Sequence, residues 1–205
     1  GSASANALLM KTVFRMGVPV SGKNFFPSNI QGLPTWYEIR VSKDGYLARS
    51  GVVDIMVAMN AQTYSRDLLE VAPGGVLLYD STWPRDRLLA RSDIEIIGVP
   101  LARMCNERFT NARTRILMKN MAYVGVLAAL LELDRAVIVQ LVRETFAKKP
   151  ALIESNQQAI DLGFDYAREY LRCPLPQRVA ALNKTAGHIM IDGNTSAALG
   201  AVYAG

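Results

Sequence analysis

The chain has 205 residues, half of them hydrophobic and a fifth charged, which suits one compact globular domain with a sizeable core. Its longest apolar stretch, residues 121–131, is shorter than the about 20 residues that cross a bilayer, so we expect no membrane span. Lys and Arg exceed Asp and Glu by 23 to 18, and this net charge of +5 favours an anionic partner.

The first quarter of the chain predicts a helix followed by extended segments. In residues 2–16 small and apolar side chains recur at helical spacing, and Gly17 and Pro19 end the helix. Residues 18–26 are expected to be extended, and residues 27–34 have the composition of a loop. Residues 36–41 alternate as a half-buried strand does, and Lys43-Asp44-Gly45 has the composition of a hairpin turn.

Three short apolar runs then predict buried strands, at residues 53–59, 76–79 and 94–99. A helix is expected over residues 63–71, and Pro73-Gly74-Gly75 is expected to form a turn. Short apolar strands that alternate with helices are typical of a parallel sheet with both faces covered. The fold class is therefore α/β, with a mainly parallel, Rossmann-like sheet covered by helices.

The second half of the chain is expected to be helical. Residues 119–133 are apolar nearly all round, as in a buried helix, and Asp134 can cap a helix that turns Ile138 and Leu141 inward. A further helix over residues 151–171 ends at Cys173-Pro174-Leu175-Pro176, a segment typical of a linker. A short strand at residues 188–191 and a small-residue helix from Ala197 follow.

The residue types limit the chemistry that this chain holds by itself. Cys105 and Cys173 are far apart, and neither has a neighbouring Cys or His, which excludes a zinc-finger or iron–sulfur motif. His188 is the only histidine, so a His-based triad or a multi-histidine metal site is excluded. We expect no catalytic and no metal-ligating residue here.

Positive charge gathers in residues 85–91 and 103–115. An anionic partner such as a nucleotide, a coenzyme A phosphate or an acidic ferredoxin suits it, although arginines on solvated helix faces are the simpler explanation. No nucleic-acid-binding motif is present, so we expect no nucleic acid partner. The N-terminus has no basic stretch ahead of an apolar run, so we expect no signal peptide and a cytoplasmic protein.

Several segments together resemble the γ domain of the 2-oxoacid:ferredoxin oxidoreductases, through their order and spacing. These are Ser28-Asn29-Ile30-Gln31-Gly32-Leu33-Pro34-Thr35, Glu38-Ile39-Arg40-Val41-Ser42, residues 53–59, residues 73–80, Lys119-Asn120-Met121 with Gly125, Phe146-Ala147-Lys148-Lys149 and Asn156. Gly193-Asn194 and the small residues to Gly205 resemble the opening of the family's pyrimidine-binding domain. The family's glycine-rich loop would precede Ser2.

This resemblance implies a domain organisation and a reaction. Residues 1–172 would be the γ-type domain, 173–186 a linker, and 187–205 the truncated start of the pyrimidine-binding domain in a fused γ–α subunit of the 2-oxoglutarate type. The reaction would be coenzyme A-dependent oxidative decarboxylation of a 2-oxoacid. Thiamine diphosphate, Mg and 4Fe-4S clusters would be bound mainly by other domains or subunits, ferredoxin would take the electrons, and the enzyme would be an oligomer.

The resemblance also implies candidate site residues near coenzyme A or the thiamine site, namely Ser28, Asn29, Gln31, Gly32 and Arg40. The polar loop that holds the first four could offer hydrogen bonds toward a neighbouring active site, or could be a surface turn joining two strands. Two alternatives stay open for the whole chain. One is a Rossmann-like module that binds a nucleotide or coenzyme A without a redox role, and the other is a purely structural interface domain.

Overall fold

The computed structural model describes residues 2–26, 33–83 and 91–205. Its elements are, in chain order, α1 (Ser2–Arg15), β1 (Val20–Phe25), β2 (Trp36–Val41), β3 (Val53–Ala58), α2 (Tyr64–Glu70), β4 (Val71–Asp80), β5 (Glu95–Val99), α3 (Leu101–Arg108), α4 (Ala112–Leu130), α5 (Arg135–Thr145), α6 (Pro150–Tyr170) and α7 (Gly193–Ala204). No helix in the described part of the chain has the length and hydropathy needed to cross a membrane.

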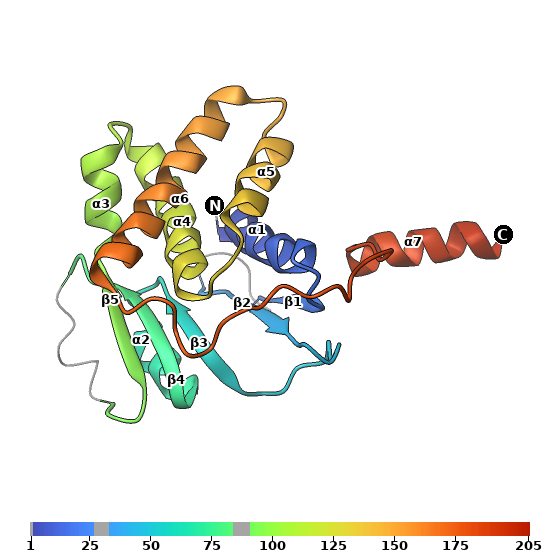
Figure 1. Cartoon of the computed structure of the whole chain (residues 1–205), viewed down its shortest axis with the longest axis horizontal. Helices are drawn as coiled ribbons and strands as arrows, with labels where there is room; N and C mark the ends of the chain where they lie inside the picture. The colour runs from blue at the N-terminus through green and yellow to red at the C-terminus, as the bar shows by residue number, and fades with distance from the viewer. Residues whose placement is uncertain (1, 27–32, 84–90) are drawn as a thin grey trace.

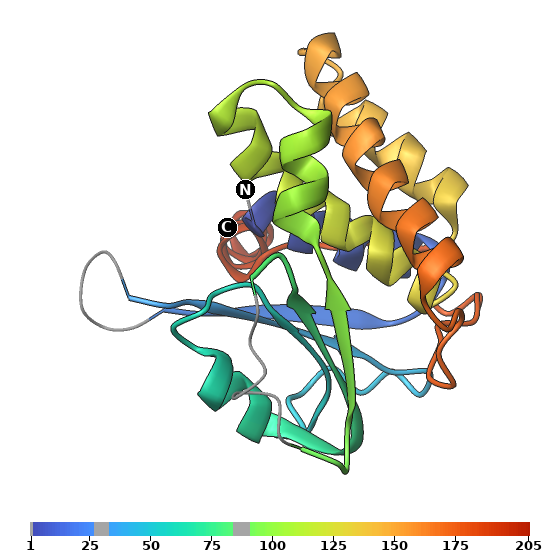
Figure 2. The ribbon, with the colours of Figure 1, turned by 90° about the vertical axis from the view of Figure 1, so that its left-hand side faces the viewer.

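The strands form two sheets (Figure 1). A three-stranded parallel sheet has the order β3-β4-β5, and β1 and β2 form a separate antiparallel pair in which Val20 lies opposite Val41. Figure 2 shows the larger helices on one side of the parallel sheet and α2 on the other side. This arrangement confirms the predicted α/β fold with a parallel sheet and helices.

Helix α4 lies at the centre of the core, and every residue from Met121 to Leu130 is buried. Its main partner is α6, and two glycines allow the two backbones to come into contact. A Cβ atom on Gly125 would lie 1.9 Å from the carbonyl oxygen of Ile160, and one on Gly163 would lie 1.9 Å from that of Ala122. Because the sheet and other helices surround α4, its sequence is apolar nearly all round, as predicted.

Helix α5 begins as the sequence predicts. The Asp134 carboxylate accepts hydrogen bonds from the backbone N–H groups of Ala136 (2.8 Å) and Val137 (3.3 Å), which are among the unpaired donors of the first turn. Ile138 and Leu141 on this helix are buried, as expected.

Three local expectations were wrong. Lys43-Asp44-Gly45 does form a turn, but it joins no hairpin, because β2 pairs with β1 and the next strand belongs to the other sheet. Pro73-Gly74-Gly75 lies inside β4, where an irregularity in the pairing with β3 takes up the extra residues and Gly74 adopts φ +78°. Residues 188–191 form no strand.

The segment that was expected to be a linker, residues 173–186, lies across the body of the domain as a hydrogen-bonded strap. The N–H groups of Leu175 and Val179 donate to the carbonyls of Leu130 and Leu131, at the end of α4. Farther along the strap, the N–H groups of Leu182 and Lys184 donate to Met16 and Gly17, just after α1, while Leu175 is fully buried. The strap therefore caps the carboxyl ends of two helices.

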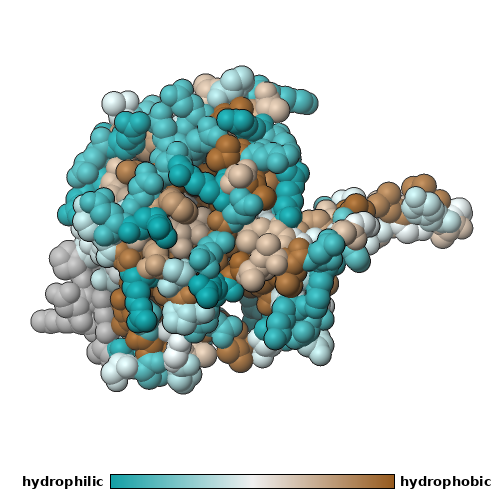
Figure 3. Space-filling model, in the orientation of Figure 1, coloured by the Kyte–Doolittle hydropathy of each residue, from teal (hydrophilic) through white to brown (hydrophobic). Residues whose placement is uncertain are grey.

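Helix α7, beyond the strap, has no buried residue. In the space-filling view it extends away from the body and carries several brown, apolar side chains, whereas the visible face of the body is mostly hydrophilic (Figure 3).

Candidate functional site

The carboxyl ends of the parallel strands are the place to look for a ligand site, because open α/β sheets bind ligands just outside these ends. Strand β3 ends at Ala58, β4 at Asp80 and β5 at Val99, where Pro100 leads directly into α3. Of these terminal residues, only Asp80 carries a polar side chain.

The Asp80 carboxylate is buried, with 2% of the residue exposed, and it organises the start of α3. Its Oδ1 atom accepts hydrogen bonds from the backbone N–H (3.1 Å) and hydroxyl (2.6 Å) of Thr82 and from the N–H of Ala102 (3.4 Å). The Thr82 hydroxyl accepts in turn from the N–H of Arg103 (3.1 Å). Because Pro100 offers no side-chain cap, Asp80 and Thr82 supply the acceptors that the first turn of α3 needs.

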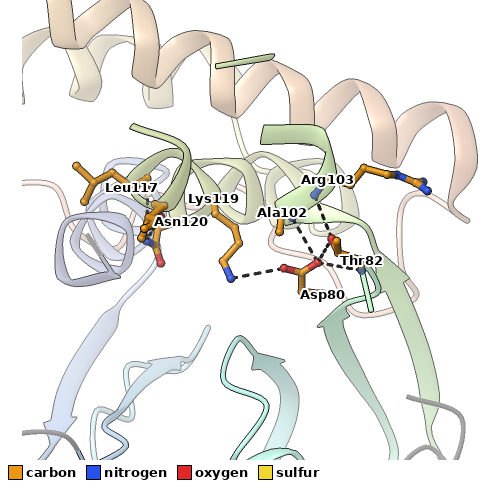
Figure 4. Close-up of polar contacts among 8 residues, drawn as sticks. Asp80, Thr82, Ala102, Arg103, Leu117, Lys119 and Asn120 are labelled. Atoms are coloured by element: carbon orange, nitrogen blue, oxygen red, sulfur yellow. Dashed lines mark hydrogen bonds and ion pairs between the residues drawn. The ribbon is translucent and has the colours of Figure 1, made fainter. Parts of the chain in front are cut away.

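Lys119, in the first half of α4, completes this site (Figure 4). Its Nζ atom lies 3.5 Å from Asp80 Oδ2, an oxygen that is buried and makes no hydrogen bond to any described residue. About a quarter of the Lys119 side chain is exposed (24%), whereas only 3% of the Asp80 side chain is. A fixed carboxylate thus holds a cation at the surface next to the carboxyl end of β4, an arrangement that suits the binding of an anionic group.

The cysteine closest to this site is a structural thiol. Cys105 on α3 is fully buried, and burial, with a smaller contribution from Asp80, raises its pKa to about 11. A thiol in this state is inert. No group of three or more His, Cys, Asp or Glu side chains that could hold a metal ion occurs in residues 2–26, 33–83 and 91–205.

Of the predicted site residues, Ser28, Asn29, Gln31 and Gly32 lie outside the described residues. Arg40 lies on β2, where its Nη1 atom donates to the Ser50 hydroxyl (3.1 Å) and its Nε atom is buried without a hydrogen-bond partner among the described residues. No hydrogen bond or ion pair joins Arg40 to Asp80 or Lys119.

The start of β2, which follows the predicted loop, is held against α2. The Trp36 Nε1–H donates to Asp67 Oδ1 (2.9 Å), and the Thr63 hydroxyl donates to Asp67 Oδ2 (2.6 Å). The Arg66 guanidinium lies over the Trp36 ring, 4.3 Å from its centre. Asp67 is buried and lies on the helix that follows β3, so this contact ties the antiparallel pair of β1 and β2 to the carboxyl end of the parallel sheet.

Among the arginines predicted to meet an anion, Arg91 has a structural role instead. It donates to Asp93 (2.9 and 2.6 Å) and to the carbonyls of Leu68 (2.7 Å) and Val71 (2.8 Å). Arg85 and Arg87 lie outside the described residues.

The sequence prediction did not include Asp80 and Lys119 among the candidate site residues. The available signal was a carboxylate at the end of an apolar strand, since residues there face the ligand side of a parallel sheet. Lys119 was harder to find, because its distance to Asp80 depends on how α4 crosses the sheet.

The family model described as pyruvate ferredoxin/flavodoxin oxidoreductase matches residues 1–166. A curated relative from Aeropyrum pernix, "2-oxoacid:ferredoxin oxidoreductase 2, subunit alpha", is 24% identical over all of this chain and 38% of its own length. The ketoisovalerate oxidoreductase subunit VorA of Methanothermobacter thermautotrophicus is 29% identical over 57% of this chain and 23% of its own length. The chain therefore spans well under half of the length of these relatives.

Two solved structures share the fold. A 2-oxoglutarate:ferredoxin oxidoreductase from Magnetococcus marinus, solved with 2-oxoglutarate, coenzyme A and succinyl-CoA bound, matches with a TM-score of 0.84 at 22% identity, over 97% of this chain and 34% of that one. The γ subunit of a keto/oxoacid ferredoxin oxidoreductase from Geobacter sulfurreducens matches with a TM-score of 0.61 at 16% identity, over 81% of this chain and 90% of that subunit.

Proposed function

Because the chain belongs to the pyruvate ferredoxin/flavodoxin oxidoreductase family, we propose that it is part of a subunit of a 2-oxoacid:ferredoxin oxidoreductase. The observation that carries this proposal is the family match over residues 1–166, which covers both sheets and most of α6. Residues 1–172 are the γ-type domain, residues 173–186 connect it, and residues 187–205 open the pyrimidine-binding domain of a fused γ–α subunit. The likeness to one third of a longer oxidoreductase chain supports this order.

The proposed reaction is the coenzyme A-dependent oxidative decarboxylation of a 2-oxoacid, with ferredoxin as the electron acceptor. We favour 2-oxoglutarate as the substrate because the solved structure with a TM-score of 0.84 is named for that acid. The relative named for ketoisovalerate makes a branched-chain acid the second candidate.

The redox chemistry belongs to other parts of the enzyme. A 4Fe-4S cluster takes four cysteine thiolates, and this chain has two cysteines, both with a pKa raised mainly by burial. The chain does not fit such a cluster. Thiamine diphosphate, with its Mg, would supply the decarboxylation chemistry from adjoining domains, and the residues described here would contribute binding and positioning.

Coenzyme A is the ligand that this chain is proposed to contact. Lys119 offers a half-buried ammonium group to a phosphate, and Asp80 holds that group in place through the 3.5 Å ion pair. Ser28, Asn29, Gln31, Gly32 and Arg40 are proposed to contact the same ligand or the vicinity of the thiamine site. The charge of +5 favours a polyanionic ligand of this kind.

The test uses the intact enzyme with all its subunits and a viologen dye as electron acceptor. Reduction of the dye is measured with 2-oxoglutarate, pyruvate and a branched-chain 2-oxoacid, each with and without coenzyme A. Coenzyme A-dependent reduction with 2-oxoglutarate as the best substrate is expected. If the protein binds coenzyme A by calorimetry but reduces the dye with none of the acids, a coenzyme A-binding module without a redox role replaces this proposal.

The contribution of Lys119 is tested by Lys119→Met, which keeps the apolar stem and removes the charge. The KM for coenzyme A is expected to rise about tenfold or more, as for the loss of a charged hydrogen bond, while the KM for the 2-oxoacid stays unchanged. Lys148→Met, at an exposed lysine after α5, is the matched control and is expected to change neither value. An unchanged KM for coenzyme A in Lys119→Met would remove Lys119 from the site.

A further inference from the structure

The corner where α3 ends and α4 begins carries exposed arginines from both helices. We define the α3–α4 corner by five exposed residues, which are Arg103 at the start of α3, Arg108 at its end, and Arg113, Ile116 and Leu117 in the first turns of α4. Glu107 on α3 is exposed as well, and from Arg108 to Leu131 the sequence has no Asp or Glu. Figure 2 shows α3 and the first turns of α4 side by side, on the side of the molecule that faces the viewer.

The side chains of the three corner arginines have no partner among the described residues. Their guanidinium groups form no ion pair or hydrogen bond with any described residue, in contrast to Arg115, whose Nε atom donates to the carbonyl of Phe109 (2.6 Å). No pairing with a described side chain therefore explains Arg103, Arg108 and Arg113.

Two of the three arginines lie where the local electrostatics disfavour a cation, whereas Arg108 lies in the last turn of α3, where a cation is favourable. Arg103 lies in the first turn of α3 and Arg113 in the first turn of α4, and neither turn has an acidic residue. The amino end of a helix carries partial positive charge, so cations there are unfavourable. Uncompensated charges of this kind are expected where a partner supplies the opposite charge.

Two exposed aliphatic side chains lie beside the arginines. Ile116 is 69% exposed and Leu117 is 37% exposed, one turn after Arg113 on α4. Exposed aliphatic side chains next to arginines are typical of protein–protein interfaces, where an apolar centre is surrounded by a charged rim. A small anion such as coenzyme A would leave Ile116 exposed, and a nucleic acid backbone offers it little apolar surface.

We propose that the α3–α4 corner docks an acidic protein surface, with carboxylates opposite Arg103, Arg108 and Arg113 and an apolar side chain against Ile116. The partner is another subunit of the same enzyme, so this assignment rests on the function proposed above. The electrostatic part of such an interface acts mainly through charge complementarity and weakens as salt rises.

The test is the assembly of the intact enzyme, measured by sedimentation velocity over a dilution series at low and at high salt. In Arg108→Glu/Arg113→Glu the midpoint concentration for dissociation is expected to rise about tenfold or more at low salt, and by less at high salt. Ile116→Asp is expected to weaken assembly at both salt concentrations. Arg143→Glu/Arg168→Glu is the matched control, because these arginines of α5 and α6 are also exposed and form no ion pair with described residues.

Unchanged assembly in both corner variants, with native circular dichroism, would overturn the proposal. A labelled duplex oligonucleotide, followed by fluorescence anisotropy, tests the other class of polyanion. Tight oligonucleotide binding that is lost in Arg108→Glu/Arg113→Glu, together with unchanged assembly, would assign the corner to nucleic acid and overturn the proposal too. Viologen reduction is recorded separately, so salt-sensitive assembly without 2-oxoacid oxidation would refute the proposed function and leave the docking surface standing.

Discussion

Replacing Gly125 by alanine is expected to destabilise the domain, although alanine is the better helix former. The added Cβ atom would lie 1.9 Å from the carbonyl oxygen of Ile160 and 2.8 Å from the backbone nitrogen of Phe164. Both atoms belong to the backbone of α6 and cannot rotate away. Ordinary contact begins near 3.4 Å, so α4 and α6 must separate by about 1.5 Å.

The magnitude follows from two opposing effects. Overpacking a tight core costs about 1–3 kcal/mol, and a clash with backbone atoms belongs at the upper end of this range. Alanine recovers about 1 kcal/mol of helix propensity. The expected net loss is about 2 kcal/mol in the free energy of unfolding, which lowers the Tm of a domain of this size by about 4–8 °C.

The assay is thermal and urea denaturation followed by circular dichroism. Gly163→Ala is expected to behave in the same way, because its Cβ atom would lie 1.9 Å from the carbonyl oxygen of Ala122. The double variant should cost less than the two single variants together, since one separation of the helices relieves both clashes.

Gly200→Ala is the matched control, because this glycine lies inside α7 and a Cβ atom there has nothing within 4 Å. It is expected to leave the unfolding transition unchanged or slightly higher. Wild-type stability in Gly125→Ala would refute the view that backbone contact fixes the crossing of α4 and α6.

Three further predictions concern single side chains. Asp67→Ala leaves the Nε1–H of Trp36 without its acceptor, so a loss of about 2 kcal/mol in urea denaturation and a red shift of tryptophan emission are expected. The hydrogen bond from Arg15 lowers the pKa of Glu144 from 4.5, so the stability that this contact adds is present above pH 4.5 and is lost as the pH falls through the lowered pKa. The Tm difference between wild type and Arg15→Gln should therefore shrink in acid, and a Tm difference that stays constant with pH would contradict this. The Cys105 thiol, buried and with a pKa raised to about 11, should react with a thiol reagent only as the domain unfolds, and fast labelling of the native protein would contradict this.

The parallel sheet could be predicted because its strands are short apolar runs with few polar residues. Residues 53–59, 76–79 and 94–99 each correspond to a strand, since short apolar runs of this kind are typical of a parallel sheet. The start of α5 was also predictable, because Asp134 precedes an amphipathic segment and its carboxylate accepts hydrogen bonds from backbone N–H groups only two and three residues away.

Long-range geometry decided what the sequence alone could not show. Pro73-Gly74-Gly75 has the composition of a turn, yet β3 extends the pairing past it and Gly74 absorbs the irregularity. The ion pair of Lys119 and Asp80 joins residues that lie 39 positions apart, and it depends on where α4 crosses the end of β4. The predicted loop residues Ser28, Asn29, Gln31 and Gly32 stay a prediction.

The strap of residues 173–186 has a consequence for dissecting this protein. A fragment that stops at Arg172 would lose the donors for the carbonyls of Leu130, Leu131, Met16 and Gly17 and the buried side chain of Leu175. These backbone carbonyls at the ends of α4 and α1 would then have only water as a hydrogen-bond donor. A force applied to the chain after the strap would be transmitted to α1 and α4 through the same hydrogen bonds. The strap is part of the folded domain, so a boundary drawn at its first residue would cut through a folding unit.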